Sequence, residues 1–342
     1  MIRFRPGNLA DLDGVLRLLT DAGDSLKGLS TLRPYPDLIE GRLAKGVESF
    51  GAEVAEPGEE VYFFVLEDMD AGTIIGTGAI YAAVGKPEAF YSYRIGTRVF
   101  TSRELGVYKQ VPTLFLTNDY TGKSEIGSLF LDSAYRRKSS GRLTSISRLL
   151  FIAEHPERFT DKIFAEMRGF QLPDGTAPFW EGIGRHFFGM PFPEADDISA
   201  RGNKTFIAEL MPVLPIYVTL LPYAVQDAIG RVHPETEPAL RLLQSEGFAS
   251  GGYIDIFDGG PTLEVEKRRL RAVVESEIAI VVVAEPTAEG TAYIVTNRGL
   301  ANFRSVVEEA TINDNVVTLR PEVADALEIS DGDSVRCLPV RP

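Results

Sequence analysis

A short basic turn in the middle of the chain has the residue types of a phosphate-binding site. The apolar run Leu129–Asp132 is followed by Tyr-Arg-Arg-Lys-Ser-Ser-Gly, residues 135–141, and then by a helical pattern. Small residues let backbone N–H groups converge on an anion, and the start of the next helix adds positive potential. Arg136 and Arg137 supply charge for a polyanion. An ordinary basic turn between a strand and a helix is the alternative interpretation.

One histidine stands where a proton could be transferred. His233 follows Val232 and precedes Pro234, just ahead of a helical pattern that ends at Gly247. An imidazole has an ordinary pKa of about 6.5, so it can accept and return a proton near neutral pH. The alternative is a histidine that packs and caps beside the start of a helix.

The other histidines and the cysteine indicate no further chemistry. His155 ends an apolar helical pattern and His186 lies beside aromatic residues, so both are interpreted as structural. The three histidines lack the spacing of metal ligands, and Cys337 is the single cysteine. We therefore predict no metal, no permanently bound cofactor, no intrachain disulfide and, by default, a reducing compartment.

The order of these features resembles the GNAT superfamily of acyl-CoA N-acyltransferases. Its signature turn, Q/R-x-x-G-x-G/A, is matched by Arg136 and Gly141, with Ser139 in place of the first glycine, where a Cβ restricts φ. Its late helix ends Leu-Tyr-x-x-x-Gly-Phe, which LLQSEGF at residues 242–248 approximates. The resemblance implies an α+β fold with a mixed, mostly antiparallel sheet flanked by helices. It also implies that the turn, Ser140 included, binds the phosphates of an acyl-CoA.

Longer blocks resemble one family within that superfamily, the arginine N-succinyltransferases. They are YRIGTRVFTSRELGVYKQVPTLFLTNDYTG, AEMRG, FIAELMP, QDAIGRVHPETEPA and YIDIFDGGPTLE, and they lie between roughly residues 60 and 265. The resemblance implies transfer of succinyl from succinyl-CoA to the α-amine of L-arginine, in arginine catabolism. It further implies that His233, in Val-His-Pro, is the proton donor and that Leu129, in Leu-Phe-Leu-Asp, binds succinyl-CoA.

The charges of these substrates require partners on the protein. Succinyl and arginine each carry a carboxylate, for which Arg94 and Arg168 are the candidates. The guanidinium of arginine requires carboxylates, and Glu166, Asp255 and Asp258 are the candidates. Structural salt bridges, solvated charges or, for Asp258-Gly-Gly-Pro, a simple turn are the alternatives, and the sequence does not rank them.

Apolar periodicity predicts the elements that must position these residues. The first half is expected to contain a strand at 2–5, helices at 12–19 and 35–49, a hairpin of strands 61–67 and 73–83, strands at 90–99, 113–117 and 125–132, and an amphipathic helix at 143–152. The second half is expected to contain strands at 163–167 and 205–211 around a helix at 179–188, then the helix after His233 and a strand at 252–257.

Composition and charge suit a soluble enzyme. The formal net charge of −14 over 342 residues argues against a nucleic-acid or anionic-membrane surface, because phosphate binding requires clustered cations. The hydrophobic content of 44% allows a large core. No run of about 18 apolar residues and no signal-peptide core occurs, so a cytoplasmic location is expected by elimination.

A change of texture near residue 264 predicts two parts. The charged run EVEKRRLR is followed by short β-like pieces. We therefore predict a GNAT-like acyltransferase domain at 1–265 and a small β-rich C-terminal domain at 266–342. Ornithine or another amino acid as acceptor, acetyl-CoA as donor, and a homodimer or a heteromeric arginine/ornithine succinyltransferase remain open. So does a GNAT-like binding protein without turnover, because fold does not fix function.

Overall fold

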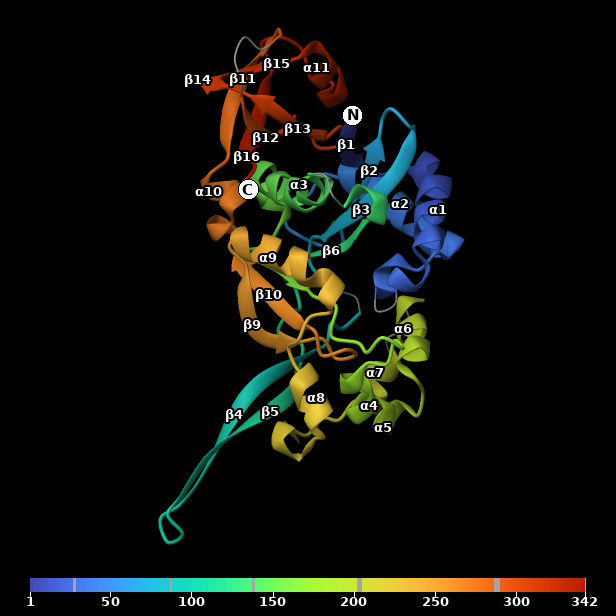
Figure 1. Ribbon diagram of the computed structural model, residues 1–342, viewed down its shortest axis with the longest axis vertical. Coiled ribbons are helices and arrows are strands. Elements are labelled where there is room, and N and C mark those ends of the chain that lie inside the picture. Colours follow the sequence, from blue (N-terminus) through green and yellow to red (C-terminus); the bar gives the residue numbers. More distant parts are fainter. Residues whose placement is uncertain (27–28, 87, 137–138, 202–204, 286–289, 342) are drawn as a thin grey trace.

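The structure is a computed structural model that describes residues 1–26, 29–86, 88–136, 139–201, 205–285 and 290–341. In this part of the chain the strands form one sixteen-stranded sheet, in the order β14-β15-β11-β16-β12-β13-β1-β2-β3-β6-β7-β10-β9-β4-β5-β8. Among the described strands, the pairs are antiparallel except β6–β7 and β11–β15. Helices flank the sheet (Figure 1). The expected α+β class, with a mixed and mostly antiparallel sheet flanked by helices, is confirmed.

Two helices cover the first strands of the chain. The elements are β1 (Ile2–Pro6), α1 (Leu12–Ala22), α2 (Pro36–Gly51), β2 (Val61–Asp68) and β3 (Thr73–Tyr81). Val15, Leu18 and Leu19 recur at helical spacing, so they share one face of α1, and that face is buried with Phe63 and Val65 of β2. The predicted strand, helices and hairpin of this region are confirmed, with β2 and β3 paired antiparallel along their length.

A long hairpin projects from the body of the molecule (Figure 1). It consists of β4 (Ser92–Ser102) and β5 (Val107–Thr117), and its base pairs with β9 (Ala249–Ile254) and β8 (Ile216–Tyr217). The predicted strands at 90–99 and 113–117 mark only part of it. The distal half gives a weak sequence signal because its side chains lie in solvent rather than in a core.

The next elements are three central strands and one long helix. These elements are β6 (Ser124–Leu131), α3 (Ser140–Glu154), β7 (Lys162–Glu166) and β10 (Pro261–Glu266). Leu143, Ile146 and Leu150 of α3 pack in the main core with Phe64 of β2. The predicted strand and helix are confirmed here, but the predicted amphipathic character is wrong, because residues 143–152 of α3 are buried on all sides.

Several short helices gather in the lower part of the molecule, near the base of the β4–β5 hairpin (Figure 1). These are α4 (Pro178–Gly182), α5 (Gly184–Phe188), α6 (Phe192–Ala200), α7 (Thr205–Leu210) and α8 (Tyr223–Ala228). The strand predicted at 205–211 is wrong, because α7 occupies these residues. Ile207 and Met211 lie four residues apart and are both buried, which is the spacing of a helical face. A short apolar run does not distinguish a strand from a buried helix.

The C-terminal region adds its own strands and core. Ahead of this region, α9 (Glu237–Ser245) leads into β9. The region itself contains α10 (Arg271–Val274), β11 (Glu277–Val283), β12 (Thr291–Thr296), β13 (Ser305–Ala310), β14 (Ile312–Asn313), β15 (Val316–Leu319), α11 (Pro321–Leu327) and β16 (Ser334–Pro339). Val281, Val295 and Leu327 belong to a separate hydrophobic cluster. β13 joins β1 at one pair, Phe4 with Ser305. We propose that this region, 266–342, is the β-rich appendage predicted from the sequence.

Within the residues described, every helix falls short of the length and apolar character that a membrane span requires.

Candidate active site

The strands β6 and β7 run parallel for two residue pairs and then separate. Ser124 lies opposite Ile163 and Glu125 lies opposite Phe164, after which β6 follows β3 while β7 follows β10. The separation opens into two cavities of about 190 and 720 Å³. Both are lined by Leu29, Leu129, Arg168, Thr236 and Ala239. The cavities therefore form one continuous cleft between β6, β7 and α9.

The two cavities carry opposite charge. The larger, which we call the arginine-lined cavity, contains six arginines and two glutamates: Arg136, Arg142, Arg168, Arg241, Arg271 and Arg341 with Glu235 and Glu246. The smaller, which we call the inner cavity, contains five carboxylates and two arginines: Glu125, Glu166, Asp196, Asp255 and Asp258 with Arg148 and Arg168. Coulomb attraction therefore favours a polyanion in the first cavity and a cation in the second.

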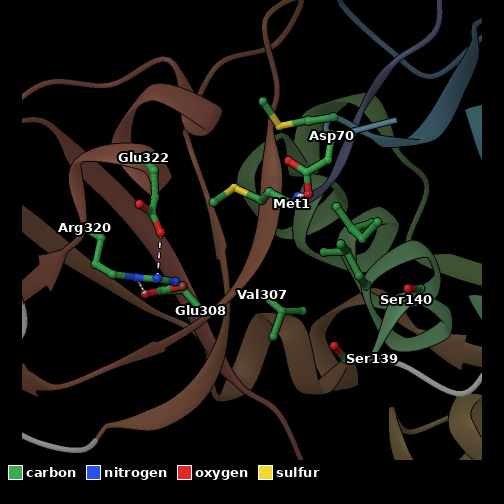
Figure 2. A pocket seen from close by; sticks show the side chains of 11 residues that line it. Met1, Asp70, Ser139, Ser140, Val307, Glu308, Arg320 and Glu322 are labelled. Carbon is green, nitrogen blue, oxygen red and sulfur yellow. Dashed lines mark hydrogen bonds and ion pairs between the residues drawn. The ribbon is translucent and has the colours of Figure 1, made fainter. Parts of the chain in front are cut away.

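The basic turn divides between the arginine-lined cavity and a separate one. Arg136 and Gly141 line the arginine-lined cavity, and Nε of Arg136 donates to the Leu131 carbonyl at 3.4 Å. Ser139 and Ser140 line a cavity of about 660 Å³ beside the first residues of the chain (Figure 2). Arg137 lies outside the described residues. The structure thus brings Arg136 and Gly141, but not the two serines, to the lining of the cleft.

The cavity beside Ser139 and Ser140 is internally neutralised. Its guanidinium, Arg320, forms two bonds of 2.8 Å to the carboxylate of Glu308 and a 2.6 Å ion pair with Glu322 (Figure 2). The N-terminal ammonium of Met1 pairs with Asp70. These charges are already matched, so the cavity offers less to an anion than the arginine-lined cavity does.

β6 bulges where it passes both cavities. Ser128 and Leu129 together lie opposite a single residue of β3, Gly78. Ser128 has a φ of 50°, a left-handed conformation that is uncommon for residues other than glycine, and its carbonyl accepts a bond from Thr77 Oγ1 at 2.9 Å. A bulge removes backbone groups from the ladder and redirects the strand. Leu129 therefore lies in the bulge at the junction of the cavities, both of which it lines.

His233 lies at the rim of the cleft, in the loop ahead of α9. Its main-chain N–H donates to the Arg168 carbonyl at 2.8 Å, and its Nδ1 accepts from the Glu235 N–H at 3.2 Å. A ring nitrogen that accepts carries no hydrogen, so the neutral ring has its hydrogen on Nε2. Thr236 and Glu235 line the arginine-lined cavity. The imidazole is not among the described side chains that line either cavity.

The surroundings of His233 keep its ring neutral. Burial lowers the pKa of the imidazole below its usual range, and the nearby cation of Arg168 lowers it further, while Glu235 acts in the opposite direction. A ring with a lowered pKa is unprotonated at neutral pH. It is thus able to accept a proton there, at Nδ1 in place of the long bond from Glu235.

Arg168 joins the two cavities. Its side chain is 6% exposed, donates to Gln171 Oε1 at 3.1 Å and lies 3.7 Å from a carboxylate oxygen of Glu235. Burial lowers the pKa of its guanidinium, and Glu235, Asp258 and Asp196 oppose that change. The predicted position of Arg168 in the site is thus compatible with the structure, since the residue lines both cavities.

The three predicted carboxylates meet in the inner cavity. Glu166 ends β7, while Asp255 and Asp258 lie in the loop between β9 and β10. Asp258 accepts N–H bonds from Gly169 at 2.6 Å and Gly260 at 2.9 Å. Burial and the neighbouring Asp255 raise the pKa of Asp258 well above its usual range, against the effect of these two bonds.

The loop that carries these aspartates is tightly built. Asp255 Oδ1 accepts the N–H groups of Phe257 at 2.7 Å and Asp258 at 2.8 Å, which is an Asx turn. A Cβ on Gly169 would lie 2.4 Å from the Asp258 carbonyl, so only glycine fits there. The turn considered as an alternative for Asp258 is therefore present, and the same turn brings the two carboxylates to the cavity.

Arg94 is not brought to the cleft. It is exposed on β4, opposite Tyr253 of β9, and does not belong to the described lining of either cavity. The structure instead adds Arg148 of α3, which the sequence analysis did not single out. The sequence did contain a signal for Arg148, which is an arginine within the apolar helix LTSISRLLFIAE. In the structure, its neighbours in this helix are buried on every side.

No cluster suited to a metal ion occurs among the described residues, where such a cluster means three or more His, Cys, Asp or Glu. Cys337 is buried, and burial raises the pKa of its thiol to about 12, so it is not a nucleophile at neutral pH. The cleft thus combines a cavity whose charge suits a polyanion, a cavity whose charge suits a cation, and an imidazole at its rim.

Two family models together match most of the chain. The model described as arginine N-succinyltransferase beta subunit matches residues 2–272, and the model of the C-terminal domain of that subunit matches residues 276–339.

Individual proteins are similar over their whole length. Arginine N-succinyltransferase subunit beta of Pseudomonas aeruginosa is 44% identical, over 98% of this chain and 97% of that protein. Arginine N-succinyltransferase of Yersinia pseudotuberculosis is 42% identical, over 98% and 97%. The solved structure of arginine/ornithine succinyltransferase subunit AI from Pseudomonas aeruginosa matches with a TM-score of 0.92 at 38% identity, covering 100% of this chain and 99% of that one.

Proposed function

This chain belongs to the arginine N-succinyltransferase beta subunit family, and we propose that it transfers succinyl from succinyl-CoA to the α-amine of L-arginine. The observation that carries the proposal is the charge of the cleft. An arginine-lined cavity suited to a polyphosphate leads directly into an inner cavity rich in carboxylates, which suits a guanidinium. CoA and arginine are the anionic and cationic partners that such a pair of cavities would select.

In this proposal the donor enters along α3. Its phosphates bind at Arg136 and Gly141, which line the arginine-lined cavity, with Arg137 assigned from the sequence alone; Ser139 and Ser140 line the other cavity and are not assigned to the donor. The helix start adds a favourable potential for anions. The pantetheine arm then follows the arginine-lined cavity to Leu129, where a backbone N–H in the bulge is suited to bind the thioester oxygen as it gains negative charge.

The acceptor occupies the inner cavity. We assign its guanidinium to Glu166, Asp255 and Asp258 and its carboxylate to Arg168, because a charge buried in a cavity requires an opposite charge or hydrogen bonds. Arg94 was the other carboxylate candidate; its place on the hairpin gives it no such role within this chain's own cleft. The α-amine is then left to face the thioester at the junction of the cavities.

His233 moves the proton in this mechanism. The α-ammonium must lose a proton before its nitrogen can attack the thioester carbon, and we assign that proton to the imidazole, which its lowered pKa keeps neutral. The C–N bond forms, the attached nitrogen releases its second proton to water, the C–S bond breaks, and the imidazolium returns the first proton to the sulfur of CoA, so that one proton is released overall. The products are N2-succinylarginine and CoA with a thiol, and no metal or permanent cofactor is required.

Ornithine is the second candidate acceptor. The matching solved structure is of an arginine/ornithine succinyltransferase subunit, and ornithine carries a shorter cation that the same carboxylates would attract. A steady-state assay of released thiol with succinyl-CoA and L-arginine tests the primary proposal. Replacing arginine by ornithine and succinyl-CoA by acetyl-CoA ranks the alternatives. Absence of turnover with every pair would leave only the non-catalytic binding protein.

We also propose an assembly of subunits, either a homodimer or a pair with a paralogous chain, in the cytoplasm. The names of two relatives include the word subunit. On the hairpin of β4 and β5, the exposed fraction is 49% for Val99, 76% for Leu105 and 65% for Tyr108. Apolar side chains that project into solvent favour a protein interface.

A further inference from the structure

Arg148 is a buried cation at the inner end of the cleft. It lies about two turns from the start of α3, is 1% exposed and lines the inner cavity. Burial lowers the pKa of its guanidinium to about 10, so the group stays charged at neutral pH. Gly78 of β3 makes room for it, because a Cβ there would lie 3.1 Å from the Arg148 Cδ.

The protein partners of this guanidinium are neutral and incomplete. Nη1 donates to the Gly127 carbonyl at 3.1 Å and Nη2 to the Ser145 hydroxyl at 3.3 Å, while Nε is buried without a partner. Among the residues described, no carboxylate forms an ion pair with it; its hydrogen-bond partners are a carbonyl and a hydroxyl. A guanidinium has five N–H groups in a planar fork, so several remain for another anion. A buried charge left in this state is costly unless something pairs with it.

The position of Arg148 identifies that anion. Its Nη1 bonds the residue immediately before the bulge at Ser128 and Leu129, and the same cavity is lined by Arg148 and by both bulge residues. We propose that Arg148 binds the terminal carboxylate of the donor's acyl group, and so selects a four-carbon acyl chain that ends in a carboxylate. This inference rests on the proposed function, in which the thioester lies at Leu129. A carboxylate matches the guanidinium fork through two parallel N–H···O bonds.

Arg168, the other arginine of the inner cavity, is suited to a different carboxylate. Its guanidinium already contacts Gln171 and Glu235, and Asp258 and Asp196 add negative charge around it. Arg148 lacks such a carboxylate neighbour among the described residues. The two arginines thus divide the two substrate carboxylates, with Arg148 taking that of the donor and Arg168 that of the acceptor.

Butyryl-CoA is the matched probe, because it has the chain length of succinyl-CoA with a methyl group in place of the carboxylate. In Arg148→Met, kcat/KM for succinyl-CoA relative to butyryl-CoA should fall by about 10- to 150-fold, the usual effect of a charged hydrogen bond, while butyryl transfer stays within a few-fold. Arg136→Met, at the phosphate turn, is the control and should weaken both donors by the same factor. A parallel loss of both donors in Arg148→Met would mean a structural role and would overturn the proposal.

Two further measurements keep the test independent of folding and of the acceptor. Arg148→Lys keeps the charge and should retain part of the preference; a preference as low as that of Arg148→Met would contradict ion pairing. Calorimetry without any amine should show tighter binding of succinyl-CoA than of butyryl-CoA to the wild type, with the difference lost in Arg148→Met. Equal binding of the two donors to the wild type would sink the inference. A wild type that prefers succinyl-CoA but does not acylate arginine would instead refute the proposed function alone.

Discussion

The main-chain N–H of His233 donates to the carbonyl of Arg168 at 2.8 Å, and the adjacent residues Gly169 and Val232 form an isolated β-bridge. The segment after β7 and the loop before α9 are thereby fixed to each other across the cleft. The same relationship places the guanidinium of Arg168 where it lowers the pKa of the imidazole. The proposed proton carrier and the proposed carboxylate-binding residue are therefore coupled in geometry and in charge.

Removal of the imidazole should abolish most of the catalysis. We expect His233→Ala to reduce kcat by about 10²–10⁴, the usual contribution of general acid–base catalysis, with KM for succinyl-CoA nearly unchanged because the phosphate turn lies elsewhere. His233→Gln is the control that retains an acceptor for the Glu235 N–H. If the ring only packs beside the helix, melting temperature should fall while kcat per folded molecule stays within a few-fold.

The pH profile should show the lowered pKa directly. A base must be unprotonated to act, so activity is lost as pH falls through its pKa. The midpoint of this acidic limb in the pH profile of kcat/KM should therefore lie below about 6.5, the ordinary pKa of an imidazole. Arg168→Met removes a cation that disfavours the imidazolium, so the limb should move to higher pH. If the acidic limb does not move in Arg168→Met, the pH dependence does not arise from His233.

Bulk at the phosphate turn should affect the donor more than the acceptor. A Cβ on Gly141 would lie 3.8 Å from Leu131 Cδ2, an ordinary contact, so Gly141→Ala should be tolerated. The larger branched side chain of Gly141→Val extends toward the arginine-lined cavity and should raise KM for succinyl-CoA by about tenfold or more, well above its effect on KM for arginine. An unchanged donor KM in folded Gly141→Val would remove the turn from the binding site.

A neutral side chain at the end of β7 should weaken the acceptor. We expect Glu166→Gln to raise KM for L-arginine by about 10- to 150-fold, since it removes a charged partner of the guanidinium, and to leave KM for succinyl-CoA within a few-fold. Citrulline, which replaces the guanidinium by a neutral urea group, is the matched substrate. The variant should discriminate less between arginine and citrulline than the wild type does; equal discrimination would reassign Glu166 to a structural role.

Charges on the projecting hairpin should disrupt assembly. Leu105→Glu and Tyr108→Glu together would place carboxylates where an interface would bury apolar area, so the particle mass by light scattering should fall toward that of one 37.5 kDa chain. The melting temperature of the body should stay within about 2 °C, because the tip lies outside the cores. An unchanged mass would move the proposed interface away from the hairpin, and a single-chain wild type would refute assembly.

The sequence by itself determined the features that are encoded over short distances. The helix face of Val15 and Leu19, the hairpin of β2 and β3, and the strand that leads into the basic turn could all be predicted, because periodicity and turn residues act within about ten positions. The loop position of His233, ahead of a helix, was also readable. Its neutral state was not, because the lowered pKa of the imidazole depends first on burial in the fold and then on Arg168, which is 65 residues away in the chain.

Only the tertiary structure decided which side chains share the cleft. Arg94 and Arg168 were equivalent candidates in the sequence, yet one lies on an exposed hairpin strand and the other at the junction of two cavities. Ser139 and Ser140 line a different cavity from the one that their neighbour Gly141 lines. Arg148 became a candidate only because the fold buries it beside Gly78 of β3 and Gly127 of β6. The physical reason is that burial and charge pairing depend on contacts between distant segments, and these contacts form only when β6 and β7 separate and α3 packs against β3 and β6.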